Sequence, residues 1–89
     1  MVTVKCVKLS ENAVIPSHES LGAAGCDLSA AIDENVMIPP HQTVKIPTGL
    51  AMELPDGTFG AIYARSGIAT KEGLAPANKV GVVDADYRG

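Results

Sequence analysis

The sequence is poor in aromatic and sulfur-containing residues, and both shortages restrict what the chain can be. Its 89 residues include no Trp, one Phe, two Tyr and two Cys. A chain of this length lies near the lower limit for a self-sufficient core, and two cysteines are too few for a disulfide scaffold. The apolar residues are mostly Ala, Val, Ile and Leu. We therefore expect one small domain, residues 1–89, held together by aliphatic packing.

The cysteines suggest neither a redox motif nor a metal centre. They are far apart in the sequence, so they form no CxxC pair. Cys6 alternates with Val2 and Val4, which favours a free buried thiol. The four residues that zinc prefers have a spacing that matches no zinc pattern: Cys6, Cys26, His18 and His41.

Basic residues and long apolar runs are also scarce. Seven Lys and Arg residues stand against ten Asp and Glu residues, and the formal net charge is −3. The basic residues are dispersed, so we expect no non-specific nucleic-acid binding, although a local basic site could hold a small anion. No segment has the pattern of a signal peptide or a membrane span. We expect a reduced intracellular setting, the cytoplasm by default, with the nucleus left open.

Glycine and proline, by contrast, are frequent. Nine Gly and six Pro separate short apolar runs, a pattern typical of an all-β sandwich or barrel. We expect residues 50–54 and 59–64 to form a hairpin across a turn at residues 55–58, followed by a short helical turn at 68–72. Further strands are expected at residues 2–8, 36–38, 43–46 and from 78 onward.

The last twelve residues form the most informative stretch. Val80, Val82 and Val83 favour a strand, and Asp84-Ala85-Asp86 favours a turn after it. Two carboxylates, a phenol and a guanidinium thus fall within five residues. This arrangement suits a water, a sugar and an anion, but an ordinary hairpin with a solvated acidic turn has the same pattern. Because a return strand should follow, the chain reads as if it stops within the domain.

Two earlier stretches carry related chemistry. Arg65, Ser66 and Gly67 follow a predicted strand, where a guanidinium fork, a hydroxyl and close backbone approach can grip a phosphate. A surface turn with a solvated Arg is the other interpretation. Upstream, residues 21–30 contain two glycines and three alanines around Asp27, and small residues let the backbone approach a neighbour closely.

Together the three stretches resemble the first three motifs of the trimeric dUTPases, in order and in spacing. The matching segments are residues 24–28, 64–67 and 81–89, and Asn78 matches as well. The resemblance implies a dUTPase-like β-clip, a distorted jelly roll, of which these residues are the N-terminal portion. Two positions depart from the family pattern: Ala64 stands for a proline, and Cys26 stands where an aromatic residue is common. The family's fourth motif and glycine-rich fifth motif have no match here.

The resemblance also implies an activity, the cleavage of dUTP to dUMP and pyrophosphate. Water attacks the α-phosphorus while Mg²⁺ is bound to the triphosphate. Asp84 matches the residue that activates this water, and Asp27 matches the carboxylate that orients the magnesium shell through water. In both cases a turn carboxylate that caps local N–H groups is the competing interpretation.

The remaining matched residues concern binding. Arg65, Ser66 and Gly67 match the phosphate site, and Tyr87 matches the residue packed against deoxyribose, although a core aromatic is the other interpretation. The uracil-reading residues are matched by Asn78, Gly81 and Val83. In the family each active site combines pieces from neighbouring subunits, so a homotrimer that binds dUTP and dUMP is implied.

Two other functions are compatible with these residues. One is a dCTP deaminase relative of the same fold, whose chemistry usually needs a Glu near the pyrimidine. The other is a non-catalytic nucleotide-binding or interaction fragment. In the family the fifth motif lies on a C-terminal arm that closes over the substrate. Without that arm, we expect water exclusion and phosphate binding to be poor and the 89 residues alone to show little turnover.

Overall fold

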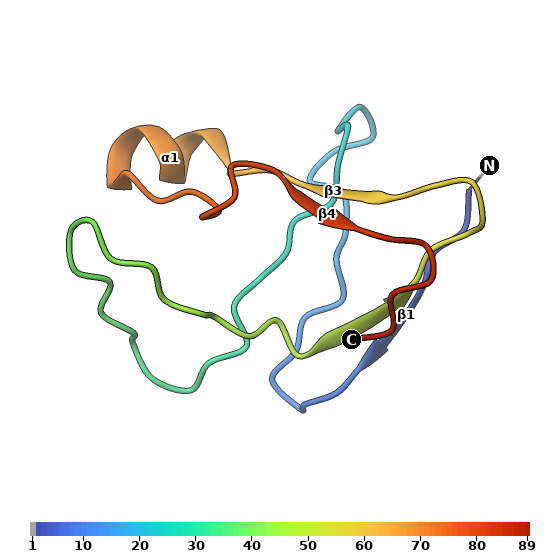
Figure 1. The fold of residues 1–89 in the computed structure, drawn as a ribbon, viewed down its shortest axis with the longest axis horizontal. Helices are drawn as coiled ribbons and strands as arrows, with labels where there is room; N and C mark the ends of the chain where they lie inside the picture. The colour runs from blue at the N-terminus through green and yellow to red at the C-terminus, as the bar shows by residue number, and fades with distance from the viewer. Residues whose placement is uncertain (1) are drawn as a thin grey trace. The chain divides into compact units, whose positions relative to one another are not determined.

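The computed structural model describes residues 2–89, which form four short strands and one helix. The elements are β1 (Lys5–Lys8), β2 (Leu50–Glu53), β3 (Gly60–Ile62), α1 (Ser66–Glu72) and β4 (Gly81–Val83) (Figure 1). β1 pairs with β2, and β3 pairs with β4, in separate two-stranded sheets. This strand-dominated pattern confirms the predicted all-β class.

The chain divides into two compact units. One contains residues 6–52, and the other contains residues 53–89 together with the N-terminal residues up to Lys5. Asp27 belongs to the first unit, whereas the other predicted site residues all belong to the second.

The unit of residues 6–52 packs around small side chains. Ala13 and Ala31 are its buried residues, and Gly49 lies against both. A Cβ atom added to Gly49 would lie 3.0 Å from Ala13 Cβ and 3.3 Å from Ala31 Cβ. Backbone hydrogen bonds hold the same region together: Leu9 N–H donates to Gly49 O at 2.6 Å, and Ala31 N–H donates to Pro47 O at 2.8 Å. Glycine is required at position 49, where φ is +67°.

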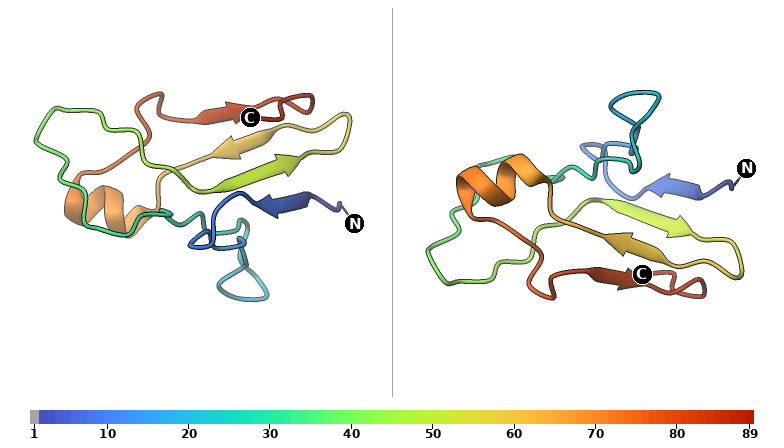
Figure 2. Two further views of the ribbon diagram at one scale, coloured as in Figure 1. Left: turned by 90° about the horizontal axis from the view of Figure 1, so that it is seen from below. Right: turned by 90° about the horizontal axis from the view of Figure 1, so that it is seen from above.

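The unit of residues 53–89 is built on the antiparallel β3–β4 ladder, which both views of Figure 2 show side by side. Gly60 pairs with Val83 at one end of the ladder, and Ile62 pairs with Gly81 at the other. Each glycine faces a β-branched residue closely: an added Cβ would lie 3.3 Å from the Cβ atom of its partner in both pairs. Opposed Cβ atoms in a sheet are normally about 4.5–5.5 Å apart, so the absent side chains are what allow this approach.

Helix α1 follows β3 and is capped at its C-terminal end by Gly73. Arg65 precedes it in an extended conformation, and Gly73 ends it at φ +67°, with its N–H bonded to Ile68 O. Lys71 lies in the last turn, where the helix dipole favours a positive charge. The predicted helical turn at residues 68–72 is confirmed, and the helix begins two residues earlier, at Ser66.

Three predictions about strands are wrong. Residues 36–38 and 43–46 are not strands in the described chain, and β2 and β3 do not form a hairpin. The turn between β2 and β3 does form, with Thr58 N–H bonded to Pro55 O at 3.2 Å. Alternating apolar residues show only that a strand is compatible with the sequence, whereas a strand also needs a partner for its backbone groups. β2 finds that partner in β1, and β3 finds it in β4.

Few side chains of the described residues are buried. Ala13 and Ala31 are buried, whereas large apolar residues such as Phe59, Val82 and Tyr87 are more than half exposed. Cys6 has a free thiol, as predicted, but it is only half-buried rather than buried. None of the helices within residues 2–89 is long and apolar enough to cross a membrane.

Candidate functional site

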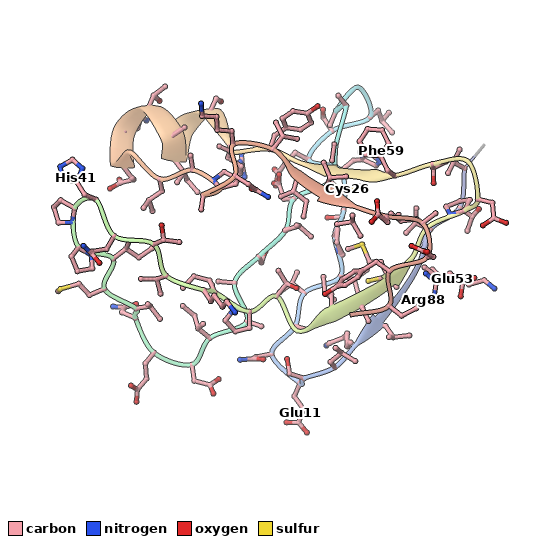
Figure 3. All side chains as sticks on the ribbon, viewed as in Figure 1. Glu11, Cys26, His41, Glu53, Phe59 and Arg88 are labelled. Atoms are coloured by element: carbon pink, nitrogen blue, oxygen red, sulfur yellow. The ribbon has the colours of Figure 1, made fainter. Side chains whose placement is uncertain are left out.

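The predicted acidic turn lies directly after β4. Tyr87 N–H donates to Asp84 O at 3.1 Å, which closes a four-residue turn. The Arg88 guanidinium returns over the same turn, and its Nη1 donates to Ala85 O at 2.7 Å and to Tyr87 O at 2.9 Å (Figure 3). Arg88, for which the sequence suggested a structural role, thus stabilises the turn that carries Asp84.

The functional groups of this turn face solvent. Asp84 and Asp86 are exposed, and Tyr87 is 57% exposed. An exposed carboxylate at the end of a ladder is accessible to a water molecule or a ligand. Tyr87 is not a core aromatic within this chain, so burial in its own unit does not explain its presence.

The predicted phosphate-binding residues lie at the junction of β3 and α1. Arg65 is the last residue before the helix, and Ser66 and Gly67 form its first turn. All three residues are exposed. The backbone here is held by the helix itself, since Arg65 O accepts from Ala69 N–H at 2.9 Å and Ser66 O accepts from Thr70 Oγ1 at 2.8 Å.

Asn78 lies in the tight turn that leads into β4. Lys79 N–H donates to Pro76 O at 3.0 Å, and Val80 N–H donates to Asn78 O at 2.7 Å. Lys79 has φ +67°, a conformation that non-glycine residues seldom adopt. Asn78 itself is exposed, so its amide is available to a ligand.

The β3–β4 register determines which of these groups lie together. Arg65 follows the Ile62 end of β3, and Asn78 precedes the Gly81 end of β4, so both lie beyond the same end of the ladder. Asp84 follows Val83, at the opposite end. At about 3.3 Å per extended residue, roughly 20 Å separates Asp84 from Arg65 along the ladder. One chain therefore does not bring its own Arg65 to its own Asp84.

Asp27 lies in the unit of residues 6–52. It is half-buried, and its N–H donates to Ser17 O at 3.3 Å. Across residues 2–89, no three His, Cys, Asp or Glu side chains gather as a metal cluster. The four zinc-type residues therefore do not form a centre, although His18 and Cys26 contact each other.

One polar hollow was not predicted from the sequence. It is open, has a volume of about 470 Å³, and lies in the unit of residues 6–52. Asn12 connects its sides, accepting from Ser10 Oγ at 2.8 Å and donating to Asp33 Oδ1 at 3.1 Å. Its lining contains none of the predicted site residues: Ser10, Glu11, Asn12 and Asp33.

Comparison with solved structures defines the class of protein first. The chain superimposes on the dUTPase of Staphylococcus bacteriophage 80alpha with a TM-score of 0.82 and 31% sequence identity, over 98% of this chain and 54% of that one. The fold is thus that of the dUTPases, and the predicted fold is confirmed.

Sequence comparison then gives the family. The dUTPase family model matches residues 11–89, so the chain belongs to the dUTPase family. It is 52% identical over 89 residues to the deoxyuridine 5'-triphosphate nucleotidohydrolase of Desulfitobacterium hafniense strain DSM 10664 / DCB-2, covering 99% of this chain and 59% of that protein. The corresponding Treponema denticola protein is 46% identical over 82 residues, covering 92% and 57%. The chain thus spans somewhat more than half the length of these relatives.

Proposed function

We propose that the chain is part of a dUTP diphosphatase, which hydrolyses dUTP to dUMP and pyrophosphate. The observation that carries this proposal is the exposed turn of residues 84–87, fastened by Arg88, in a chain of the dUTPase family. Residues 1–89 would belong to one dUTPase-like domain, since the family model crosses both compact units.

The proposed roles follow the positions of the exposed groups. Asp84 would accept a proton from the water that attacks the α-phosphorus, since its carboxylate is accessible on a fixed turn. Arg65, Ser66 and Gly67 would bind phosphate oxygens and stabilise the charge on the leaving pyrophosphate. Tyr87 would pack against the deoxyribose. The uracil-reading residues would be Asn78, Gly81 and Val83, through amide and backbone groups.

The residues present fit a magnesium ion that is held mainly by the substrate. Magnesium keeps several waters and commonly binds through phosphates with few protein ligands. The described residues offer no cage of three carboxylate, imidazole or thiol groups, which agrees with that coordination. Asp27 would orient the hydration shell through water rather than bind the metal directly. When bound, Mg²⁺ would neutralise charge on the triphosphate.

The ladder geometry supports an assembly of more than one chain, and we propose the homotrimer that the resemblance to the dUTPases implies. Because Arg65 and Asp84 lie at opposite ends of the β3–β4 ladder, a site that uses both must take them from different chains. Exposed apolar side chains such as Phe59 and Val82 provide surface for that association. The two free thiols agree with a reduced intracellular compartment, for which we propose the cytoplasm.

An assay of pyrophosphate release tests the activity. Because little turnover is expected from residues 1–89 alone, the assay uses a protein that contains these residues and has the full length of the relatives. It is incubated with dUTP and Mg²⁺, and its Asp84→Asn variant is compared with the parent protein. Because Asn cannot accept the proton, we expect turnover to fall by about 10²- to 10⁴-fold with little change in folding. Asp56→Asn is the matched control, since Asp56 is an exposed turn carboxylate in the same unit. Equal rates for Asp84→Asn and the parent protein would contradict the proposed role.

The same assay separates the two other functions. Replacing dUTP by dCTP and measuring ammonia release tests for a deaminase. Calorimetry with dUMP tests for a protein that only binds nucleotide, and binding without any pyrophosphate release would favour that function over hydrolysis.

A further inference from the structure

The turn before β4 contains a strained backbone position beside the proposed uracil-reading residues. Within the described residues 2–89, two residues other than glycine have a positive φ, His41 at +64° and Lys79 at +67°. Lys79 is also the central residue of a three-residue turn, because Val80 N–H donates to Asn78 O at 2.7 Å. A γ-turn with a positive φ at its centre is the rare and strained form of this turn.

This turn holds one peptide group in a fixed orientation. Asn78 C=O and Lys79 N–H belong to the same peptide group, and both are hydrogen-bonded. The carbonyl accepts from Val80 N–H, and Lys79 N–H donates to Pro76 O at 3.0 Å. The Asn78 carbonyl is thus used within the turn, whereas its exposed side-chain amide offers a donor and an acceptor to a ligand. The direction of that amide depends on the left-handed conformation at position 79.

We propose that Lys79 is a positioning residue of the nucleotide site, acting through its backbone conformation and not through its ammonium group. This inference rests on the proposed function, in which Asn78 reads the uracil base. A side chain in the left-handed region is strained, and such positions persist only where the surrounding structure imposes them, often at ligand sites. Here two hydrogen bonds impose the strain, and they hold in place the residue that would bind the base.

Two substitutions at position 79 separate the backbone from the side chain. Lys79→Gly removes the ammonium group and keeps the turn, since glycine adopts a positive φ readily, whereas the β-branched side chain of Lys79→Val disfavours the turn. Calorimetry measures the Kd of dUMP for a protein that contains these residues and has the full length of the relatives. We expect Lys79→Val to raise the Kd about tenfold and Lys79→Gly to change it less than about twofold. Equal losses in the two variants would show that the ammonium group binds the ligand and would overturn the proposal.

His41→Val is the matched control for general destabilisation. His41 also has a positive φ, in a turn that Gln42 N–H closes by donating to Pro39 O at 3.1 Å (Figure 3 labels His41). It lies in the unit of residues 6–52, which contains none of the proposed uracil-reading residues. This variant should lose stability in thermal unfolding, as Lys79→Val does, and should bind dUMP like the parent protein. An equal loss of dUMP binding in both variants would attribute the effect to destabilisation and would also overturn the proposal.

A double variant tests whether Lys79 acts through Asn78. Asn78→Ala removes the amide that the turn would orient, so adding Lys79→Val to it should weaken dUMP binding little further. Losses that add in full would show that Lys79 acts independently of Asn78, which contradicts the proposal.

Steady-state kinetics separate this inference from the proposed function. Because the base contributes to binding and takes no part in the reaction, Lys79→Val should raise the KM for dUTP about tenfold and leave kcat within about twofold. A parent protein with neither dUTP turnover nor dUMP binding would contradict the proposed function, and this inference with it. A parent protein that is active and binds dUMP, with Lys79→Val equal to it in both, would overturn this inference alone.

Discussion

Glycine residues in the β3–β4 ladder matter because they have no side chain. Gly81 lies opposite Ile62, and a Cβ atom at position 81 would be 3.3 Å from Ile62 Cβ. Gly67, in contrast, lies in the first turn of α1 with nothing within 4 Å of an added Cβ. The same substitution should therefore have opposite effects on stability at the two positions.

We predict that Gly81→Ala lowers the free energy of unfolding by about 1–2 kcal/mol, because the ladder must widen to accept the methyl group. Gly67→Ala should raise it by about 0.5–1 kcal/mol, because glycine is a poor helix former. Urea denaturation of the two variants and the parent protein measures both effects. If Gly67 allows close approach of phosphate, Gly67→Ala should also reduce dUTP turnover while it stabilises the fold. Stabilisation by Gly81→Ala would show that the ladder can absorb the methyl group.

At the scale of the structural elements, residues 6–52 depend on packing rather than on regular structure. β1 and the start of β2 contribute a short pair of strands, and most other residues of this unit are in turns or irregular backbone. Its best-packed place is the contact of Gly49 with Ala13 and Ala31. A larger residue at the centre of this contact has no free space to occupy.

We predict that Gly49→Ala costs about 2 kcal/mol or more of stability. The positive φ at position 49 disfavours any side chain, and the added methyl would also press on Ala13. Gly22→Ala is the matched control, since Gly22 lies in the same unit with open space around it. Thermal unfolding followed by circular dichroism should show a clear loss for Gly49→Ala and almost none for Gly22→Ala. Equal unfolding midpoints would contradict the packing role of Gly49.

The elements also show how far sequence reasoning reaches. Alternation at β2, the Pro55 turn and the helix before Gly73 were predictable because each depends on neighbours in the sequence. The partner of each strand was not, because pairing depends on contacts between distant residues. The candidate site residues came instead from the resemblance to the dUTPase motifs, and their roles stay predictions. The contact of His18 with Cys26 and the bonds of Arg88 to the turn could not be predicted, since both need the folded backbone.

At the scale of the whole molecule, apolar surface is abundant. Large apolar side chains are exposed at many positions, among them Phe59, Val82 and Tyr87. Such exposed apolar side chains are what an associating chain presents to its partners. This agrees with the inference, from the positions of Arg65 and Asp84, that a complete site needs more than one copy.

Complementation between two inactive variants tests that inference. In a protein that contains these residues and has the full length of the relatives, Arg65→Ala and Asp84→Asn should each be nearly inactive alone, since each removes one half of every site. Mixed assemblies, formed by co-expression or by joint refolding, should regain a substantial fraction of the dUTP turnover. A site that combines Arg65 of one variant with Asp84 of the other is then intact. No recovery, with mixed assembly verified by differently tagged chains, would show that both residues come from one chain.

The glycines at the two ends of the β3–β4 ladder also have a consequence for the position of the turn that carries the proposed catalytic residue, Asp84. Gly60 accommodates Val83, and Gly81 accommodates Ile62. A register shift of one residue would place residues larger than glycine opposite Val83 and Ile62. The shifted pairing is therefore less stable at both ends of the ladder. The two glycines therefore fix the register of β3 and β4, and with it the position of Asp84. A mutation that adds a side chain at either glycine is expected to shift the Asp84 carboxylate, although it does not change that residue.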